Sequence, residues 1–493
     1  MMNGEKPKRG HSMMLPQRDI VLARGAHFAT LEERLAAGKA IRQRVPRTSH
    51  ATWAPSKNRP DPIALLEEQN KTRVPGLLPI RWGRMLESPF AFMRGSARVM
   101  ATDLATTPNT GIRVQACGDC HLLNFGAYAT AERNLLFDIN DFDETLPAPW
   151  EWDVKRLGAS VDFAGRYRSF SRAERGNAVC AMTRGYREQM AEFASMTALD
   201  IWYFRFDAKT IERRFGRSGR DRDRQARSIR QAQHRTMESA FVKMTSVENG
   251  RRRIIDHPPE IFHLGEHRAH PLFNKVFTDY LDTVRDDLRV LLSRYRVIDL
   301  AFKVVGVGSV GTRCGVILMM ANDGDPLLLQ IKEANQSVLD VYAGKSKYGN
   351  NGHRVVTGQR IMQASSDMFL GWTRLKGRDY YIRQLRDMKW SQDLSTLKAK
   401  ELALYAEICG ATLARAHARS TDPAVLSGYL GRKDTFDEAI VEFARLYADQ
   451  GERDYLQLQA AVKKHRITAA RGSASTLALA TTRALTRSRK AFE

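Results

Sequence analysis

Residues 118–126 read Gly118-Asp119-Cys120-His121-Leu122-Leu123-Asn124-Phe125-Gly126, and residues 138–143 read Asp138-Ile139-Asn140-Asp141-Phe142-Asp143. In the first stretch an aspartate is followed by an asparagine, and a short hairpin then leads to the acidic second stretch. Phosphoryl transfer needs a carboxylate that orients the incoming hydroxyl, together with oxygen ligands that hold Mg²⁺ on the phosphates. The two stretches therefore predict a phosphotransfer site.

Three residues of the first stretch have expected catalytic roles. Asp119 is predicted to be the base or the carboxylate that orients the acceptor, and the amide oxygen of Asn124 is predicted to bind a metal ion. His121 is grouped with them, and its expected role is to orient the loop by hydrogen bonding. The alternative is that this stretch contains only turn-forming residues. The spacing of the polar residues favours a site.

The second stretch supplies the principal metal carboxylate. Asp141 is placed first because it follows a hydrophobic strand predicted over 135–139 and points into a turn. Asp138 and Asp143 remain competitors, since their spacing from the asparagine is also tolerable. Mg²⁺ favours such oxygen ligands and keeps some of its waters.

A glycine loop comes almost two hundred residues later. Residues 306–311 fit G-x-G-x-x-G between strands predicted over 300–305 and 312–320, and a third strand over 327–331 is followed by Lys332. A dinucleotide-binding unit would open a helix at the third glycine and end the next strand in an acid. A β-hairpin and a lysine are instead typical of a kinase nucleotide-covering loop, although a tight hairpin with a surface lysine is the alternative. The residues predicted to hold nucleotide phosphates are Gly306, Gly308, Ser309, Gly311 and Lys332.

Composition limits the class of protein. The chain has 493 residues and a formal net charge of +23, which predicts two or three domain-sized units and an attraction for polyanions. Basic residues cluster over 205–235 and 463–490, where a solvated helical face and a loose terminus are the alternative. The apolar runs are too short to span a bilayer, and no signal peptide is expected.

The five cysteines are few and scattered, which argues against a disulfide framework and favours a cytoplasmic protein. Cys117 and Cys120 form a single C-x-x-C pair. Without a second pair, or a helix beginning at the motif, neither a zinc site nor a redox pair is expected.

The periodicity predicts an α+β protein. We expect an N-terminal extension over 1–80, a catalytic-loop and helical region over 81–300, a β-rich glycine-loop region over 301–390, and a helical region over 391–493 with a basic tail from about 465. Further expected elements are a strand over 112–116, a helix beginning at 150–160, helices through most of 172–300, a helix over 353–369, a strand over 379–385 and a helix over 395–419.

With these residues assembled, the chain resembles the bacterial family called domain of unknown function 2252, which is grouped with protein-kinase-like folds. The resemblance covers about residues 75–450. The stretches that carry it are residues 80–85, 90–95, 118–126, 137–145, 151–157, 303–313, 329–334, 381–385 and 411–417.

A more distant resemblance, to aminoglycoside phosphotransferases and kinases, implies roles for single residues. Asp119 and Asn124 match the catalytic-loop aspartate and asparagine, Asp141 matches the metal-binding aspartate, and Lys332 matches the phosphate-contacting lysine. Asp153 looks like the buried aspartate that supports the catalytic loop.

Two features depart from the kinase pattern. The catalytic loop precedes the glycine loop, which implies a bilobal kinase-like fold that has been circularly permuted, with the 395–419 helix as the one that ordinarily leads into the catalytic loop. Second, no glutamate in the 353–369 helix can pair with Lys332; Gln359 is the best-placed substitute and Glu333 a poor one.

The expected activity is ATP- and Mg²⁺-dependent phosphoryl transfer to an unidentified hydroxyl-bearing acceptor. Arg94 and Arg383 are flanked by apolar residues and are assigned to nucleotide binding, with a structural ion pair as the alternative. Nucleotidyl transfer to protein, and a catalytically inactive nucleotide-binding or nucleic-acid-binding scaffold, are the alternative functions.

Overall fold

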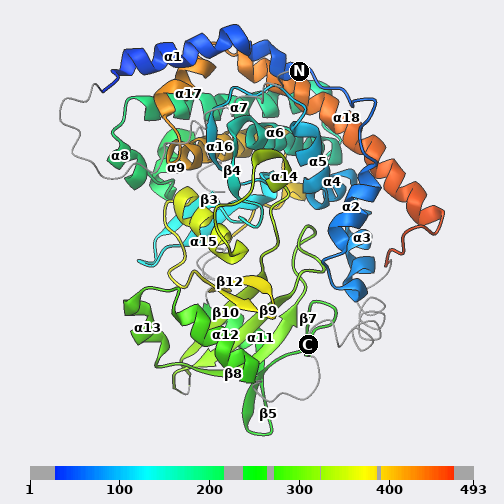
Figure 1. Cartoon of the computed structure of the whole chain (residues 1–493), viewed down its shortest axis with the longest axis vertical. Helices are drawn as coiled ribbons and strands as arrows, with labels where there is room; N and C mark the ends of the chain where they lie inside the picture. The colour runs from blue at the N-terminus through cyan, green and yellow to red at the C-terminus, as the bar shows by residue number, and fades with distance from the viewer. Residues whose placement is uncertain (1–27, 216–236, 264–270, 323, 386–389, 471–493) are drawn as a thin grey trace, which may run out of the picture.

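The computed structural model contains both helices and antiparallel sheets, which confirms the α+β class (Figure 1). The structure describes residues 28–215, 237–263, 271–322, 324–385 and 390–470. Most of the basic run over 205–235 and of the basic tail lies outside these residues. A layer of helices covers one end of the molecule in Figure 1, and a six-stranded sheet forms the other end.

Two long helices form the centre of the helical layer. Helix α16 (Ala399–Ala418) packs closely against α7 (Arg172–Ala194): a Cβ added at Gly410 would lie 1.9 Å from the carbonyl oxygen of Met182. Only a residue without a side chain therefore allows the two backbones to approach this closely. The layer is completed by α6 (Trp150–Tyr167), α8 (Ala198–Tyr203), α9 (Ala208–Phe215), α17 (Pro423–Leu430) and α18 (Thr435–Lys463).

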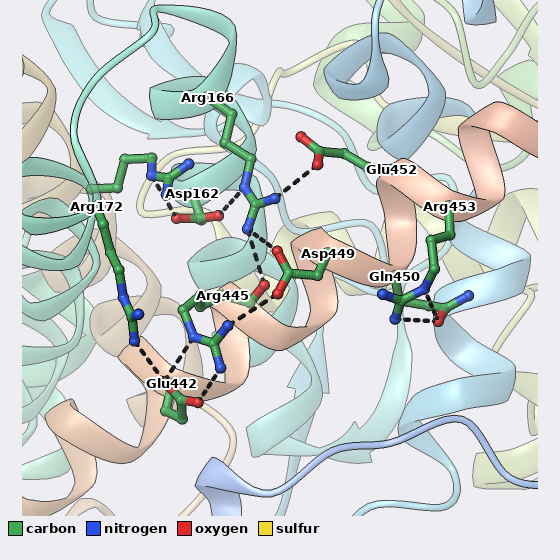
Figure 2. A network of polar contacts seen from close by, with 10 residues as sticks. Asp162, Arg166, Arg172, Glu442, Arg445, Asp449, Gln450, Glu452 and Arg453 are labelled. Atoms are coloured by element: carbon green, nitrogen blue, oxygen red, sulfur yellow. Dashed lines mark hydrogen bonds and ion pairs between the residues drawn. The ribbon is translucent and has the colours of Figure 1, made fainter.

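Ion pairs join α6 to α18. The guanidinium of Arg166 contacts the carboxylates of Asp162 at 2.7 Å, Asp449 at 2.7 Å and Glu452 at 2.9 Å, as Figure 2 shows. Arg445 of α18 bonds to the same Asp449 at 3.0 Å. These ion pairs hold helices α6 and α18 against each other beside the apolar core.

N-terminal helices extend from the helical layer towards the sheet (Figure 1). Helix α1 (Leu31–Arg44) packs on α17, where Arg42 donates to the carbonyl of Tyr429 at 2.9 Å. The following elements are η1 (Arg47–Ala51), α2 (Pro62–Asn70), η2 (Pro75–Leu77), α3 (Leu78–Met85), α4 (Pro89–Gly95) and α5 (Ala97–Leu104).

The large sheet is antiparallel, with strand order β11-β12-β10-β9-β8-β7. Helix α15 (Asn351–Met362) contacts β11 and β12, α12 (Pro271–Leu281) contacts β11, and α11 (Met237–Met244) contacts β10. The strands are β7 (Ile261–Phe262), β8 (Arg296–Lys303), β9 (Cys314–Met320), β10 (Pro326–Glu333), β11 (Gly371–Leu375) and β12 (Arg378–Gln384); α13 (Asp286–Leu292) precedes β8.

Two small sheets carry the polar stretches. Strand β1 (Arg113–Ala116) pairs with β4 (Leu146–Pro149), and β2 (Phe125–Ala129) pairs with β3 (Leu135–Ile139). Between them lie the polar stretch over 118–126, with η3 (Leu122–Asn124), and the acidic stretch over 138–143. The remaining short helices are α14 (Asp340–Ala343) and η4 (Leu394–Thr396).

The expectation of helices through most of 172–300 is wrong for residues 245–262. Strands β5 (Thr245–Glu248) and β6 (Arg251–Ile254) form a hairpin there, and β7 joins the large sheet. Asn249 and Gly250 form the turn with φ values of 50° and 72°, as a two-residue hairpin loop requires. The Asn-Gly pair was the missed signal.

Two further differences are smaller. Helix α15 ends at Met362 rather than near 369, where Ser365, Ser366 and Asp367 favour a turn. Strand β11 was not predicted, although Lys376 and Gly377, with φ values of 48° and 75°, close its hairpin with β12. Among the described residues, none of the helices has both the length and the apolar character of a membrane span.

Candidate functional site

The two separated stretches of sequence meet at one cavity of about 280 Å³. The Nζ of Lys332 lies 2.7 Å from Oδ2 of Asp143 and 4.0 Å from Oδ1 of Asp141, although 189 positions separate Lys332 from Asp143 in the chain. The cavity is also lined by Asp119, Asn124 and the glycine loop. The structure thus brings Asp119, Asp141, Asp143 and Asn124 to one cavity, and Lys332, which is not among the lining residues, reaches it through its ion pair with Asp143.

Asp153 supports the start of the loop over 118–126. Its carboxylate accepts hydrogen bonds from the backbone N–H groups of Cys117 at 2.6 Å and Gly118 at 2.9 Å. On its other side it contacts Nε2 of His417 at 3.2 Å, at the end of α16. Buried donors around a buried carboxylate hold it in a single position, so the loop conformation is fixed by α6 and α16.

Asp119 is held by an arginine that the sequence analysis missed. The Nε of Arg156, a residue only 2% exposed, donates to Oδ1 of Asp119 at 2.8 Å. The Nδ2 of Asn124 donates to the backbone oxygen of Asp119 at 2.6 Å. Both contacts orient the loop, and half of the Asp119 carboxylate remains available to the cavity. The sequence around Arg156 contains Asp153 and Lys155 as well as apolar residues, and it carried no signal for this ion pair.

Asp143 forms the ion pair with Lys332. Its carboxylate also accepts hydrogen bonds from Tyr381 Oη at 2.6 Å and Ser309 Oγ at 3.2 Å. Burial opposes its ionisation, but Lys332 and Tyr381 outweigh burial and lower the pKa of Asp143 to about 2. Burial likewise opposes the charged lysine, yet the charges of Asp143, Tyr381 and Asp141 hold the pKa of Lys332 well above its usual value.

Asp141 has fewer side-chain partners than Asp143. Its side chain is 38% exposed, and burial together with the nearby charge of Asp143 raises its pKa. The described residues contain no cluster of three or more His, Cys, Asp or Glu side chains arranged as a metal centre. Mg²⁺, however, is usually held by one or two carboxylates together with substrate phosphates. The carboxylate of Asp141 and the amide oxygen of Asn124, both lining the cavity, fit such a site.

The structure does not bring Asp138 into the cavity. This residue is 1% exposed and forms an ion pair with Arg415 of α16. Its oxygens also accept from the backbone N–H groups of Ile139 at 2.8 Å and Ala364 at 2.9 Å. With both oxygens bonded to protein, Asp138 joins β3 to α16 and has no free position for a metal ion.

The glycine loop lies close to Asp119, in the loop over 118–126. A Cβ added at Gly308 would lie 3.4 Å from the backbone oxygen of Arg94 and 3.9 Å from Oδ2 of Asp119. Gly306 and Gly311 have φ values of 61° and 90°, which favour glycine. Gly306, Gly308 and Ser309 line the cavity, whereas Gly311 lies behind it.

Helix α3 holds this loop from outside. The guanidinium of Arg81, which is fully buried, donates to the carbonyls of Gly308 at 2.7 Å and Gly95 at 2.8 Å. Arg84 donates to the carbonyl of Gly306 at 2.5 Å. These bonds hold the loop through the carbonyl oxygens of Gly306 and Gly308. No short motif pointed to these two arginines.

The remaining predicted residues divide into two groups. His121 and Arg94 line the cavity; burial lowers the pKa of His121 to about 3, so its imidazole is neutral at pH 7. Arg383 lies outside the cavity lining and donates to Gln330 Oε1 at 3.1 Å and to the carbonyl of Asn140 at 3.3 Å. Arg383 therefore contributes positive charge from the far side of Tyr381.

Helix α15 reaches the site through Arg354 rather than Gln359. The guanidinium of Arg354 donates to the carbonyl oxygens of Asp143 at 2.9 Å and Thr145 at 2.7 Å, whereas Gln359 bonds to Gln363 at 2.8 Å. Glu333 pairs with Arg313 and Arg378 and does not pair with Lys332. Arg354 was missed because the sequence analysis looked for an acid on this helix.

Comparisons with known proteins give one match. No curated protein and no solved structure matches the chain. The model of a protein family described as "Uncharacterized protein conserved in bacteria" matches residues 73–461, which include every residue of the site described above. The chain therefore belongs to the bacterial family DUF2252.

Proposed function

We propose that this protein is an ATP- and Mg²⁺-dependent phosphotransferase with a circularly permuted kinase-like fold. The observation that carries the proposal is the contact of Lys332 with Asp143 and Asp141 beneath a glycine loop, with Asp119 and Asn124 in the same cavity. Phosphoryl transfer depends mainly on positioning and charge stabilisation, and these residues are of the types that supply both.

The order of elements in the large sheet supports the kinase-like part. A glycine loop joins β8 to β9, a lysine lies near the end of β10, and α15 connects β10 to β11 and packs beside the site. This succession of hairpin, lysine strand and helix is the kinase arrangement for covering a nucleotide.

A contact between distant residues supports the permutation. The backbone N–H of Gln115, at the end of β1, donates to Ser420 Oγ at 2.8 Å across 305 positions of sequence. Ser420 follows α16 directly, and Gln115 precedes the catalytic loop. This contact supports a permuted order, in which the end of α16 would correspond to the point where an unpermuted chain continues into that loop.

Each residue has a task in the proposed reaction. Bound Mg–ATP would supply the transferable phosphoryl group and part of the charge neutralisation. Asp141 and Asn124 would hold the metal ion, Lys332 and the glycine loop would hold phosphates, and Asp119 would orient the acceptor hydroxyl. Arg156 keeps the Asp119 carboxylate in place through a charged hydrogen bond at 2.8 Å.

Titration calorimetry with Mg–ATP tests this proposal. Asp141→Asn removes the less committed carboxylate, and we expect it to abolish measurable Mg²⁺-dependent ATP binding. Asp286→Asn changes an aspartate whose side chain is 95% exposed, and it should bind as the wild type does. Equal binding by wild type and Asp141→Asn would contradict the proposal.

Labelled ATP then identifies the reaction. Phosphoryl transfer moves the γ-phosphate to an acceptor in a cell lysate. Transfer of the α-phosphate would replace this reaction with nucleotidyl transfer. Binding of ATP without transfer of either label would leave a nucleotide-binding protein.

A further inference from the structure

Three arginines line the cavity without a carboxylate partner. They are Arg73, Arg94 and Arg98, and they come from the segment that contains α2 to α5. Within the described part of the chain, none of the three forms an ion pair. Arginines are seldom buried without a partner, because desolvating a guanidinium is costly. Their position at one cavity therefore points to a ligand.

Arg73 is the most deeply buried of the three. Its side chain is 8% exposed, and its Nε has no hydrogen-bond partner in the described residues. One terminal nitrogen donates to the carbonyl of Val310, in the glycine loop. Burial outweighs the nearby charges of Glu144 and Glu333 and lowers the pKa of Arg73 to about 10. The residue is still charged at pH 7, so a buried positive charge faces the cavity.

Arg94 and Arg98 are half-buried and lie four positions apart. The Nε of Arg94 is buried and has no hydrogen-bond partner in the described residues. The backbone oxygen of Arg94 lies beside Gly308, near the carboxylate of Asp119. Burial lowers the pKa of Arg94, and the charge of Asp119 is the largest of those that oppose this shift, so the Arg94 guanidinium borders the Asp119 side of the cavity. Arg98 lines the same cavity.

The acids in the cavity wall do not neutralise these arginines. Most of them already have cationic partners: Asp119 with Arg156, Asp143 with Lys332, Glu333 with Arg313 and Arg378, and Glu68 with Lys71. Asp141 and Glu144 remain, and burial raises the pKa of Glu144 to about 7, so this residue is only partly ionised. The positive charge of the three arginines is therefore not balanced by the acids of the cavity wall.

We propose that Arg73, Arg94 and Arg98 form a subsite for an oxyanion, a phosphate or carboxylate group, that the phosphoryl acceptor carries beside its reacting hydroxyl. Guanidinium groups bind such oxyanions through paired charged hydrogen bonds. Through Arg94 the subsite adjoins Asp119, which would orient the acceptor, and through Arg73 it reaches the glycine loop, whereas Lys332 binds Asp143. This assignment of the acceptor class rests on the proposed phosphotransferase function.

Inorganic phosphate is the probe, titrated by calorimetry into the full-length protein in EDTA without nucleotide. We expect saturable binding that Arg94→Gln and Arg98→Gln each weaken by about tenfold, the effect of losing one charged hydrogen bond. Arg94→Lys should keep part of the affinity. Arg285→Gln changes an arginine whose side chain is 70% exposed, and it should bind as the wild type does. Thermal melts check that each variant is folded.

A second titration separates the two sources of an anion. With the site saturated by Mg²⁺ and a non-hydrolysable ATP analogue, phosphate should still bind, as an acceptor group would. Displacement of phosphate by the analogue would overturn the assignment to the acceptor. Absence of saturable phosphate binding, or equal binding by both glutamine variants and the wild type, would overturn the subsite itself. Asp141→Asn should retain phosphate binding, so failure of nucleotide binding is a separate result.

Discussion

Asp141 and Asp143 are two positions apart yet have different environments. Asp143 accepts from Lys332, Tyr381 and Ser309, whereas Asp141 is partly exposed and lies 4.0 Å from the lysine. Opposite charges lower the pKa of the first acid, and burial with a like charge raises that of the second. The first is thus suited to fixing the lysine, and the second is available to a metal ion.

Replacing Lys332 with methionine should destabilise the protein. The change leaves Asp143 without its cation. We expect the free energy of unfolding to fall by about 1–3 kcal/mol. The fall is limited because solvent screens the Asp143 carboxylate, whose side chain is 26% exposed. Urea denaturation at pH 7 measures this loss. The pKa of Asp143 is depressed from 3.8 to about 2, so its stabilising effect is present above pH 3.8 and disappears as the pH falls through about 2.

The matched variant is Lys332→Met combined with Asp143→Asn. Removing both charges should restore part of the lost stability, because no unpaired carboxylate remains. If the single lysine variant unfolds at the same urea concentration as the wild type, the ion pair does not stabilise the site.

For Glu144 we expect the opposite dependence of stability on pH. Burial raises its pKa from 4.5 to about 7, so ionisation of this group costs stability as the pH rises through that interval. In the wild type a carboxylate oxygen of Glu144 accepts a hydrogen bond from the backbone N–H of Val338 at 2.7 Å. Glu144→Gln keeps an oxygen that can accept this bond. We expect the variant to be more stable than the wild type at pH 8 by on the order of 2 kcal/mol, and not at pH 4. Thermal melts at both pH values measure the difference, and a constant difference would contradict the assignment.

At the scale of elements, the contact of α7 with α16 depends on glycine. A Cβ added at Gly410 would lie 1.9 Å from the Met182 carbonyl, so Gly410→Ala must push the helices apart. We expect a loss of about 2–3 kcal/mol in chemical denaturation. Gly176→Ala on α7 is the control, since its Cβ would meet only the Val441 side chain at 3.5 Å. The control should be neutral or stabilising, because alanine favours helix.

Helix α3 and the glycine loop are also coupled. Arg81→Gln removes bonds to the carbonyls of Gly308 and Gly95. Hydrogen–deuterium exchange of the loop over 306–311 should then be faster than in the wild type, while the β2–β3 hairpin exchanges at its usual rate. Unchanged exchange in the loop would show that helix α3 does not hold it.

Helices and strands could be predicted where their local apolar patterns are strong. Strand β3 and the start of α6 lie where their apolar patterns place them, and α16 begins within a few residues of its expected start. The β5–β6 hairpin was missed because its arginine-rich second strand has no alternating apolar pattern, although Asn249 and Gly250 carry the turn signal. Strand β11 is only five residues long and depends on β12 for its hydrogen bonds.

At the scale of the whole molecule, the sequence motifs predicted which residue types form the site, but not which other residues they contact. Asp119, Asn124 and Lys332 belong to recognisable spacings, and the structure places them around one cavity or bonded to its lining. Arg81 and Arg156 lie in stretches that carry the family resemblance, but no spacing indicated the groups that they or Arg354 bind, because those groups lie elsewhere in the sequence. Asp138 competed with Asp141 as a metal ligand in sequence, but in the structure it binds Arg415 of α16 and the backbone N–H groups of Ile139 and Ala364.

The central claim is that Lys332 and the carboxylates opposite it form one nucleotide-binding cleft. An acyl-phosphate derivative of ATP, which transfers its acyl group to a lysine beside bound phosphates, tests this claim directly when the modified lysine is identified by mass spectrometry. We expect Mg²⁺-dependent modification of Lys332 that excess ATP prevents. An unmodified Lys332, or modification that excess ATP does not prevent, would contradict the claim.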